Sequence, residues 1–229
     1  MTSLPGVADL VAVMDRLRSP GGCPWDAEQT HASLVPFAVE EVYELVEAIE
    51  TEDRPGLREE LGDLLLQVVF HARMAQEHGT DPFGLDDVAA TISAKLRRRH
   101  PHVFGDATVD DADHVSRRWD EIKRSEKSRA SALDGVPAGL PALARAQAVV
   151  SRSRRASLVL PEPSEPVSPP PGSPDPATIG RELLDVVRRA ERAGVDADAA
   201  LREAVRELEH ALRAIESGPG DENPEVRGA

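Results

Sequence analysis

Apolar residues recur at helical spacing along most of this 229-residue chain. Leu10, Met14 and Leu17 lie three or four residues apart, which predicts an amphipathic helix that ends before Pro20. The same spacing, with Pro and Gly as boundaries, predicts further helices at 36–50, 54–79, 85–99 and 115–127 and a short one within 131–150. Period-two runs bounded by turn residues are scarce, so the pattern predicts an all-α helical bundle.

A change in composition divides the chain into parts. Residues 157–177 are rich in proline, which is typical of an extended linker that cannot form a core. This linker separates a first module, residues 1–156, from a helical hairpin, residues 178–216, that is predicted to turn at Gly194. Gly, Pro and Glu dominate residues 217–229, and we expect this tail to be disordered.

The stretch VEEVYELVEAI contains four glutamates, Glu40, Glu41, Glu44 and Glu47. On a helical wheel its apolar residues gather on one side, and these glutamates occupy the other side and its flank. Taken alone, such a run is most often a solvated helix face. A metal site is the alternative interpretation, and this helix by itself does not decide between them.

A second acidic cluster changes the balance between the two interpretations. Glu59, Glu60 and Asp63 precede the run LLLQVVF, which is apolar nearly all round and predicts a buried helix. Carboxylates at the start of a buried helix are costly unless they are paired or bind a metal ion. Glu60 and Asp63 share the i, i+3 spacing of Glu41 and Glu44, so two antiparallel helices would bring the pairs together. An oxygen-only site of this kind suits Mg²⁺ or Mn²⁺ rather than zinc.

Cationic residues occur later in the chain, where they could meet a phosphate-bearing ligand. Lys95, Arg98 and Arg99 share the end of one predicted helix, and Trp119 lies four residues before Lys123 on another. Trp could stack on a base while Lys meets phosphate. Each feature also has a purely structural interpretation. The cations at 95–99 could equally stabilise a helix C-terminus. Trp119, taken alone, is more often a core residue than a stacking platform.

Charge and composition exclude some classes of function. A formal net charge of -14 argues against a protein that binds DNA or RNA through a basic surface. The single cysteine, Cys23, permits no internal disulfide and fits a cytoplasmic protein. The N-terminus lacks the pattern of a signal peptide, and no apolar run is long enough to predict a membrane span.

Several motifs in order resemble one family. EEVYE at 40–44 followed by EELGD at 59–63 is similar to the EExxE…ExxD signature of the MazG-type nucleoside triphosphate pyrophosphohydrolases. Further similarity lies in GGCPWDAEQT at 21–30, KLRRRHPHVF at 95–104, RWDEIK at 118–123 and SALDGVPAGLPALARAQ at 131–147. Together these motifs span about residues 5–155, and the ordered set is far more specific than EExxE alone.

The resemblance implies an all-α homodimer of the MazG-like type, with its active site between the helices that carry EExxE and ExxD. It implies Mg²⁺-dependent hydrolysis of ribo- or deoxynucleoside triphosphates to monophosphate and pyrophosphate, a house-cleaning reaction of the nucleotide pool. Carried over by position, the metal ligands would be Glu41, Glu44, Glu60 and Asp63, with Glu40 and Glu59 as candidate catalytic residues in the same pocket. The nucleotide would meet Lys95, Arg98, Arg99, Trp119 and Lys123.

The C-terminal hairpin departs from the family pattern. Longer members carry two copies of the module, and GRELLDVV in the hairpin echoes GDLLLQVV in the first module. In that alignment Arg181 replaces Asp63 and Thr178 replaces Glu60, so we expect a degenerate remnant without a metal site. Because activity in two-copy members is thought to depend on the second module, a catalytically weak nucleotide-binding regulatory protein is the alternative function.

Overall fold

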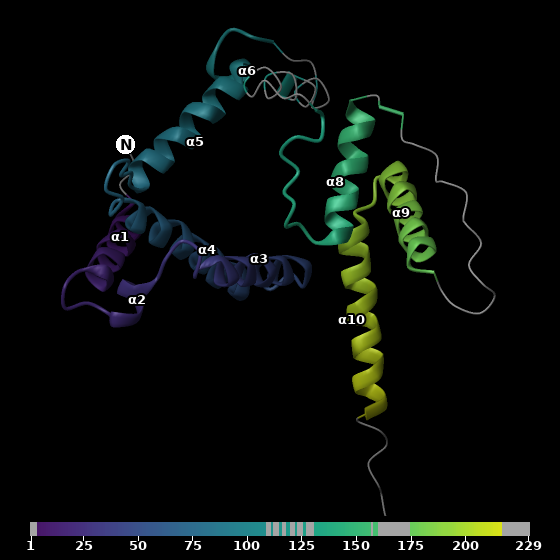
Figure 1. Ribbon diagram of the computed structural model, residues 1–229, viewed down its shortest axis with the longest axis horizontal. Coiled ribbons are helices and arrows are strands. Elements are labelled where there is room, and N and C mark those ends of the chain that lie inside the picture. The colour runs from purple at the N-terminus through teal and green to yellow at the C-terminus, as the bar shows by residue number, and fades with distance from the viewer. Residues whose placement is uncertain are drawn as a thin grey trace, which may run out of the picture. The chain divides into compact units, whose positions relative to one another are not determined.

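The computed structural model describes residues 4–108, 131–156 and 175–216, together with 111, 115, 118, 119, 122, 126, 158 and 159. All regular structure among these residues is helical, as the sequence predicted (Figure 1). The chain forms two compact units, Met1–Lys123 and Arg124–Ala229, which are described separately.

The first unit contains the helices that carry both acidic motifs. Their bounds are α1 Pro5–Arg18, α2 Pro24–Glu28, α3 Val35–Glu50, α4 Arg54–Ala75, α5 Leu85–Arg99 and α6 Pro101–Phe104. The long helices confirm the predictions, although α4 ends at Ala75 rather than Gly79. The hydrophobic pattern does not predict α2 and α6, because each has at most five residues and is too short to show a helical period.

The core of the first unit lies where α1, α4 and the residue before α3 meet. Met14, Leu34, Val69 and Phe70 are buried there, and Leu85 at the start of α5 packs against them. The short turn after α3 reverses the chain, so α3 and α4 lie side by side and antiparallel along much of their length (Figure 1). This pairing places EExxE on one helix beside ExxD on the next.

The second unit consists of α8 Ala142–Arg155, α9 Pro176–Ala193 and α10 Ala197–Glu216 in its described part. Val150, Val187 and Ala197 form its core. Gly194 adopts the left-handed conformation (φ 72°) that ends α9, which confirms the predicted turn. The sequence placed α8 in the first module, but α8 packs on α9 and α10 through Val150.

Several predicted segments lie largely or wholly outside the described residues. They are most of the helix expected at 115–127, most of the linker at 157–177 and the tail at 217–229. Within the first of these, Val115, Trp119 and Ile122 are helical, in agreement with the expected helix.

Truncation of Met14 tests the core of the first unit. Because Met14 is 1% exposed, Met14→Ala should lower the free energy of unfolding by about 2–5 kcal/mol. Val13→Ala, on the exposed side of the same helix, should change it by less than about 0.5 kcal/mol. Both tryptophans lie within residues 1–123, so urea denaturation followed by tryptophan fluorescence reports on this unit. Equal losses for the two variants would contradict this packing.

Candidate functional site

Three of the predicted ligand carboxylates converge between α3 and α4. Glu41 of α3 and Glu60 and Asp63 of α4 each offer an oxygen atom, and these atoms lie within 4.8 Å of one another. All three residues are half-buried, because the two helices shield one side of each carboxylate. The convergence follows directly from the antiparallel pairing of α3 with α4.

The charges in this cluster repel one another. Partial burial raises the pKa of the Glu41 carboxyl above its ordinary value, and the charges of Asp63 and Glu44 raise it further. Partial burial is also the largest cause that raises the pKa of Glu60, and the charges of Glu44 and Asp63 raise this pKa further. Glu44 therefore belongs to the same electrostatic cluster, although it is exposed and its oxygens lie outside the tight group of three.

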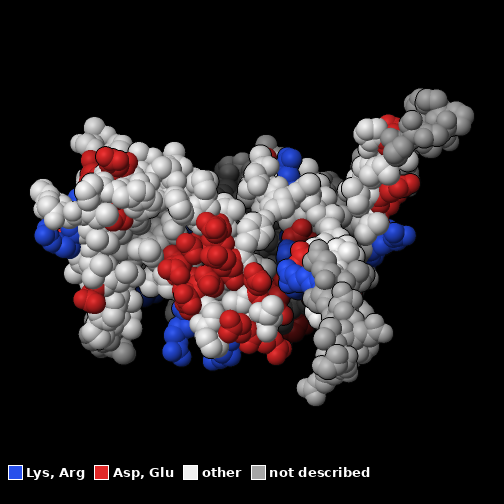
Figure 2. Space-filling model, turned by 90° about the horizontal axis from the view of Figure 1, so that it is seen from below, with Lys and Arg blue, Asp and Glu red and all other residues white. Residues whose placement is uncertain are grey.

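No cation neutralises these carboxylates within the described residues. Glu41, Glu44, Glu60 and Asp63 form no ion pair and accept no side-chain hydrogen bond from any residue that the structure describes. Figure 2 shows that Asp and Glu side chains gather into one dense patch in the middle of the face drawn there. Unpaired, half-buried carboxylates at this spacing fit a divalent cation that prefers oxygen ligands.

The other predicted acidic residues lie at the edge of this cluster. Glu40 and Glu59 are exposed neighbours of Glu41 and Glu60, and their charges add to the pKa shifts of those two carboxyls. Glu47 is exposed one turn further along α3, as expected for a residue outside the motif. From these positions, Glu40 or Glu59 could exchange a proton with a water molecule beside the ligand carboxylates.

The predicted cationic residues form a separate group at the end of α5. The guanidinium of Arg99 lies 5.4 Å from the ring centroid of Trp119, and the side chain of Arg99 is buried. The ring of His100 contacts Trp119 edge-on at 4.8 Å between centroids. Lys95 is half-buried, Arg98 is exposed, and Lys123 lies outside the described residues. Among the described helices, α5 packs on α4 and makes no packing contact with α3.

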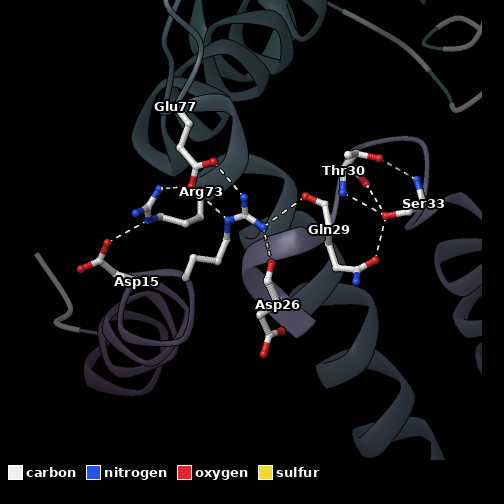
Figure 3. Close-up of polar contacts among 8 residues, drawn as sticks. Asp15, Asp26, Gln29, Thr30, Ser33, Arg73 and Glu77 are labelled. Carbon is white, nitrogen blue, oxygen red and sulfur yellow. Dashed lines mark hydrogen bonds and ion pairs between the residues drawn. The ribbon is translucent and has the colours of Figure 1, made fainter. Parts of the chain in front are cut away.

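A buried arginine organises the loop between α1 and α3, which sequence analysis did not foresee. The guanidinium of Arg18 forms an ion pair with Glu77 at 2.8 Å and donates hydrogen bonds to the carbonyl oxygens of Asp26 and Gln29. Arg73 bridges Glu77 to Asp15, with 2.8 Å in each contact (Figure 3). A hydrogen bond from Arg18 is the main cause that holds the pKa of Glu77 below its ordinary value.

The loop that Arg18 holds ends in a compact turn before α3. The backbone N–H of Thr30 donates to the Ser33 hydroxyl, and the N–H of Ser33 donates to the Thr30 hydroxyl (Figure 3). The Ser33 hydroxyl in turn donates to the side-chain oxygen of Gln29 at 2.7 Å. This turn fixes where α3 begins, and so where its glutamates lie along α4.

A contact between His31 of this loop and His71 of α4 was also missed. The Nδ1 atoms of His31 and His71 lie 2.7 Å apart, and the two ring planes are within 4° of parallel. At this separation one Nδ1 can donate a hydrogen bond to the other, and the tautomers of the two rings decide which of them donates. Partial burial and the neighbouring His31 lower the pKa of His71. Histidines 40 residues apart give no sequence signal of such contact.

Among the helices that the structure describes, none combines the length and the apolar character needed to cross a membrane.

Comparison with known proteins gives a consistent family assignment. Residues 29–104, which contain both acidic motifs, match the model of the MazG nucleotide pyrophosphohydrolase domain. A nucleoside triphosphate pyrophosphohydrolase of Escherichia coli K12 is 52% identical over 147 residues, which cover 62% of this chain and 55% of that protein.

Two further relatives match almost the whole chain. One is an uncharacterized 26.1 kDa protein of Streptomyces cacaoi, 48% identical over 93% of this chain and 84% of its own length. The other is the nucleoside triphosphate pyrophosphohydrolase/pyrophosphatase MazG of Thermotoga maritima, 37% identical over 91% of this chain and 84% of its own length. With both acidic motifs joined in one cluster and similarity along nearly its full length, this chain belongs to the MazG nucleotide pyrophosphohydrolase family.

Proposed function

We propose that this protein hydrolyses nucleoside triphosphates to nucleoside monophosphate and pyrophosphate at the carboxylate cluster of α3 and α4. The observation that carries the proposal is the convergence of Glu41, Glu60 and Asp63 from two helices, within 4.8 Å and without a cationic partner among the described residues. The names of the E. coli and T. maritima relatives support this reaction. The first unit retains every acidic residue of the signature, which favours catalysis over a purely regulatory role.

The cluster would hold Mg²⁺, with Mn²⁺ as a substitute, through Glu41, Glu44, Glu60 and Asp63. Bound there, the ion would make water more acidic and offset the negative charge of the phosphate oxygens. The carboxylates would orient the triphosphate through that ion, and Glu40 or Glu59 would accept the proton of the attacking water. Lys95, Arg98, Arg99 and Lys123 would bind phosphate oxygens, and Trp119 would contact the nucleotide.

We also propose that two copies of the chain pair through α3 and α4. The run LLLQVVF was predicted to be buried all round, but Leu65 and Val68 are exposed, and Leu61 continues their stripe. A parallel stripe on α3, made by Val35, Val39, Val42 and Ile49, is exposed as well. Apolar residues at three- and four-residue spacing on two adjacent helices are typical of one half of a four-helix bundle, and a second copy supplies the other half.

Substitution of Asp63 tests the proposed reaction. Wild-type protein with Mg²⁺ should convert nucleoside triphosphates to monophosphate and pyrophosphate, identified by anion-exchange chromatography. Asp63→Asn should lower kcat/KM by about 100-fold or more, because one charged ligand is lost. Glu47→Gln, an acidic residue of α3 outside the cluster, should leave it unchanged. Diphosphate and inorganic phosphate as products would contradict the proposal, and binding without turnover would favour the regulatory alternative.

The raised pKa values make metal binding depend on pH. A carboxyl with a raised pKa adds stability below its ordinary value of 4.5 and loses this contribution as the pH rises through the raised value. The same deprotonation prepares the site for Mg²⁺. The rise in Tm that Mg²⁺ causes should therefore be small at pH 5 and larger at pH 7, measured by differential scanning fluorimetry. Glu60→Gln should reduce this rise, and a rise that does not change with pH would contradict the assignment.

The proposed pairing predicts a change in mass when its centre becomes charged. Leu65→Arg should convert a dimer into a monomer in sedimentation equilibrium, because an arginine cannot be buried without a partner. Val103→Arg places the same charge on an exposed apolar residue of α6 and should leave the dimer intact. A wild-type monomer, or a dimer that tolerates Leu65→Arg, would exclude pairing through this face.

A further inference from the structure

One face of α4 is polar well beyond the carboxylate cluster. Glu60, Asp63, Gln67 and His71 are spaced three or four residues apart and so lie along a single stripe. Gln67 is the residue of this stripe next to Asp63, one helical turn of about 5.4 Å further along. It is 8% exposed, and its Oε1 atom accepts no hydrogen bond within the described structure. A buried amide without a partner lowers stability, so packing alone does not account for a glutamine at this position.

The corresponding turn of α3 carries an aromatic residue. Phe37 lies four residues before Glu41, and the antiparallel pairing places it on the same side of the cluster as Gln67. Its ring meets the indole of Trp25 edge to face, with 5.9 Å between centroids, and both rings are exposed. On the helical wheel, Phe37 lies away from the apolar stripe of Val39 and Val42, so the proposed pairing of two chains leaves it accessible.

A histidine pair lies one turn beyond Gln67 and Phe37. His71 of α4 meets His31 of the loop before α3 through their Nδ1 atoms at 2.7 Å. Outward from the carboxylates, α3 and α4 carry Phe37, Gln67 and His71, while α2 and the loop after it add Trp25 and His31. None of these side chains is acidic.

We propose that Gln67, Phe37, Trp25 and the His31–His71 pair form the nucleoside subsite of the enzyme. The inference rests on the proposed function, because the triphosphate must lie at the carboxylates for its nucleoside to extend along these side chains. The base stacks on the exposed rings of Phe37 and Trp25, since every base has an aromatic face. Gln67 uses its free Oε1 to accept a hydrogen bond from an N–H of the base, and its amide N–H₂ can donate to a neighbouring acceptor.

Residues other than the predicted cationic group thus recognise the base. Trp119 is engaged with Arg99 and His100, whereas Trp25 and Phe37 contact only each other among the aromatic contacts of the described residues. Every common base presents an N–H donor, so the Gln67 amide distinguishes a nucleoside triphosphate from a triphosphate without a base, and not one base from another.

The test compares substrates with and without a base. Wild-type protein and the variants Gln67→Met and Phe37→Leu are assayed with Mg²⁺ on the four ribonucleoside triphosphates and on ribose 5-triphosphate. Each variant should lower kcat/KM about 10-fold or more for the preferred nucleotide. The value for ribose 5-triphosphate should stay within about 2-fold of wild type, because the lost contacts are to the base. Gln76→Met, an exposed glutamine just after α4, is the matched control and should change neither value.

Thermal unfolding separates recognition from a structural role. Because the unpartnered amide lowers stability, Gln67→Met should keep or raise Tm while it lowers kcat/KM. Equal losses on ribose 5-triphosphate and nucleotides, or no loss on either, would overturn the subsite.

A binding measurement keeps the subsite separate from the proposed reaction. Calorimetry with a non-hydrolysable α,β-methylene nucleotide and with inorganic tripolyphosphate, both with Mg²⁺, needs no turnover. Wild type should prefer the nucleotide, and Gln67→Met should lose that preference but retain tripolyphosphate. If wild type shows this preference without hydrolysis, the proposed reaction fails and the subsite stands. If hydrolysis occurs and Gln67→Met binds like wild type, the reaction stands and the subsite fails.

Discussion

The antiparallel packing of α3 against α4 is the contact on which the site depends. It forces Glu41 against Glu60 and Asp63 at distances where their charges repel, and Glu44 adds to the repulsion. Nothing within the cluster favours this approach, so the free energy that maintains it must come from elsewhere. The core of Met14, Leu34, Val69 and Phe70 supplies it at the other end of the same helices. The apolar residues that stabilise the helix pair thus lie toward one end of it and the carboxylates toward the other. A divalent cation would relieve the repulsion between the carboxylates.

The loop between α1 and α3 links that core to the site. Arg18 is held by the carboxylate of Glu77 and contacts the ring of Phe70 at 5.5 Å, so its charge is paired although its side chain is buried. Its hydrogen bonds to the carbonyl oxygens of Asp26 and Gln29 fix the loop that carries Trp25 and ends at α3. The His31–His71 contact fixes that loop a second time, against α4. Rigid placement of α3 relative to α4 lets three carboxylate oxygens stay within 4.8 Å of one another despite their mutual repulsion.

The two faces of the helix pair have different roles. One face is polar and contains the carboxylates, Gln67 and the histidine pair. Another is apolar and exposed in the single chain, through Leu61, Leu65 and Val68 of α4 and the matching stripe of α3. Hydropathy alone predicted a buried helix for the run LLLQVVF, because an apolar residue that a second chain would bury looks the same in a sequence as one that its own chain buries. In the proposed dimer, the pairing face would stiffen the helices whose opposite face binds the nucleotide.

The sequence by itself was sufficient for the helical class, the long helices and the four ligand candidates, because periodicity and i, i+3 spacing are local properties of a chain. It was also sufficient for the turn at Gly194, since a left-handed residue there requires glycine. Tertiary structure decided which acids meet, that α8 packs with the C-terminal hairpin, and that Gln67 is buried without a partner. It also decided the contacts of Arg18 with Glu77 and of His31 with His71. Each of these depends on residues distant in sequence, and their encounter is determined by how helices pack rather than by any local pattern.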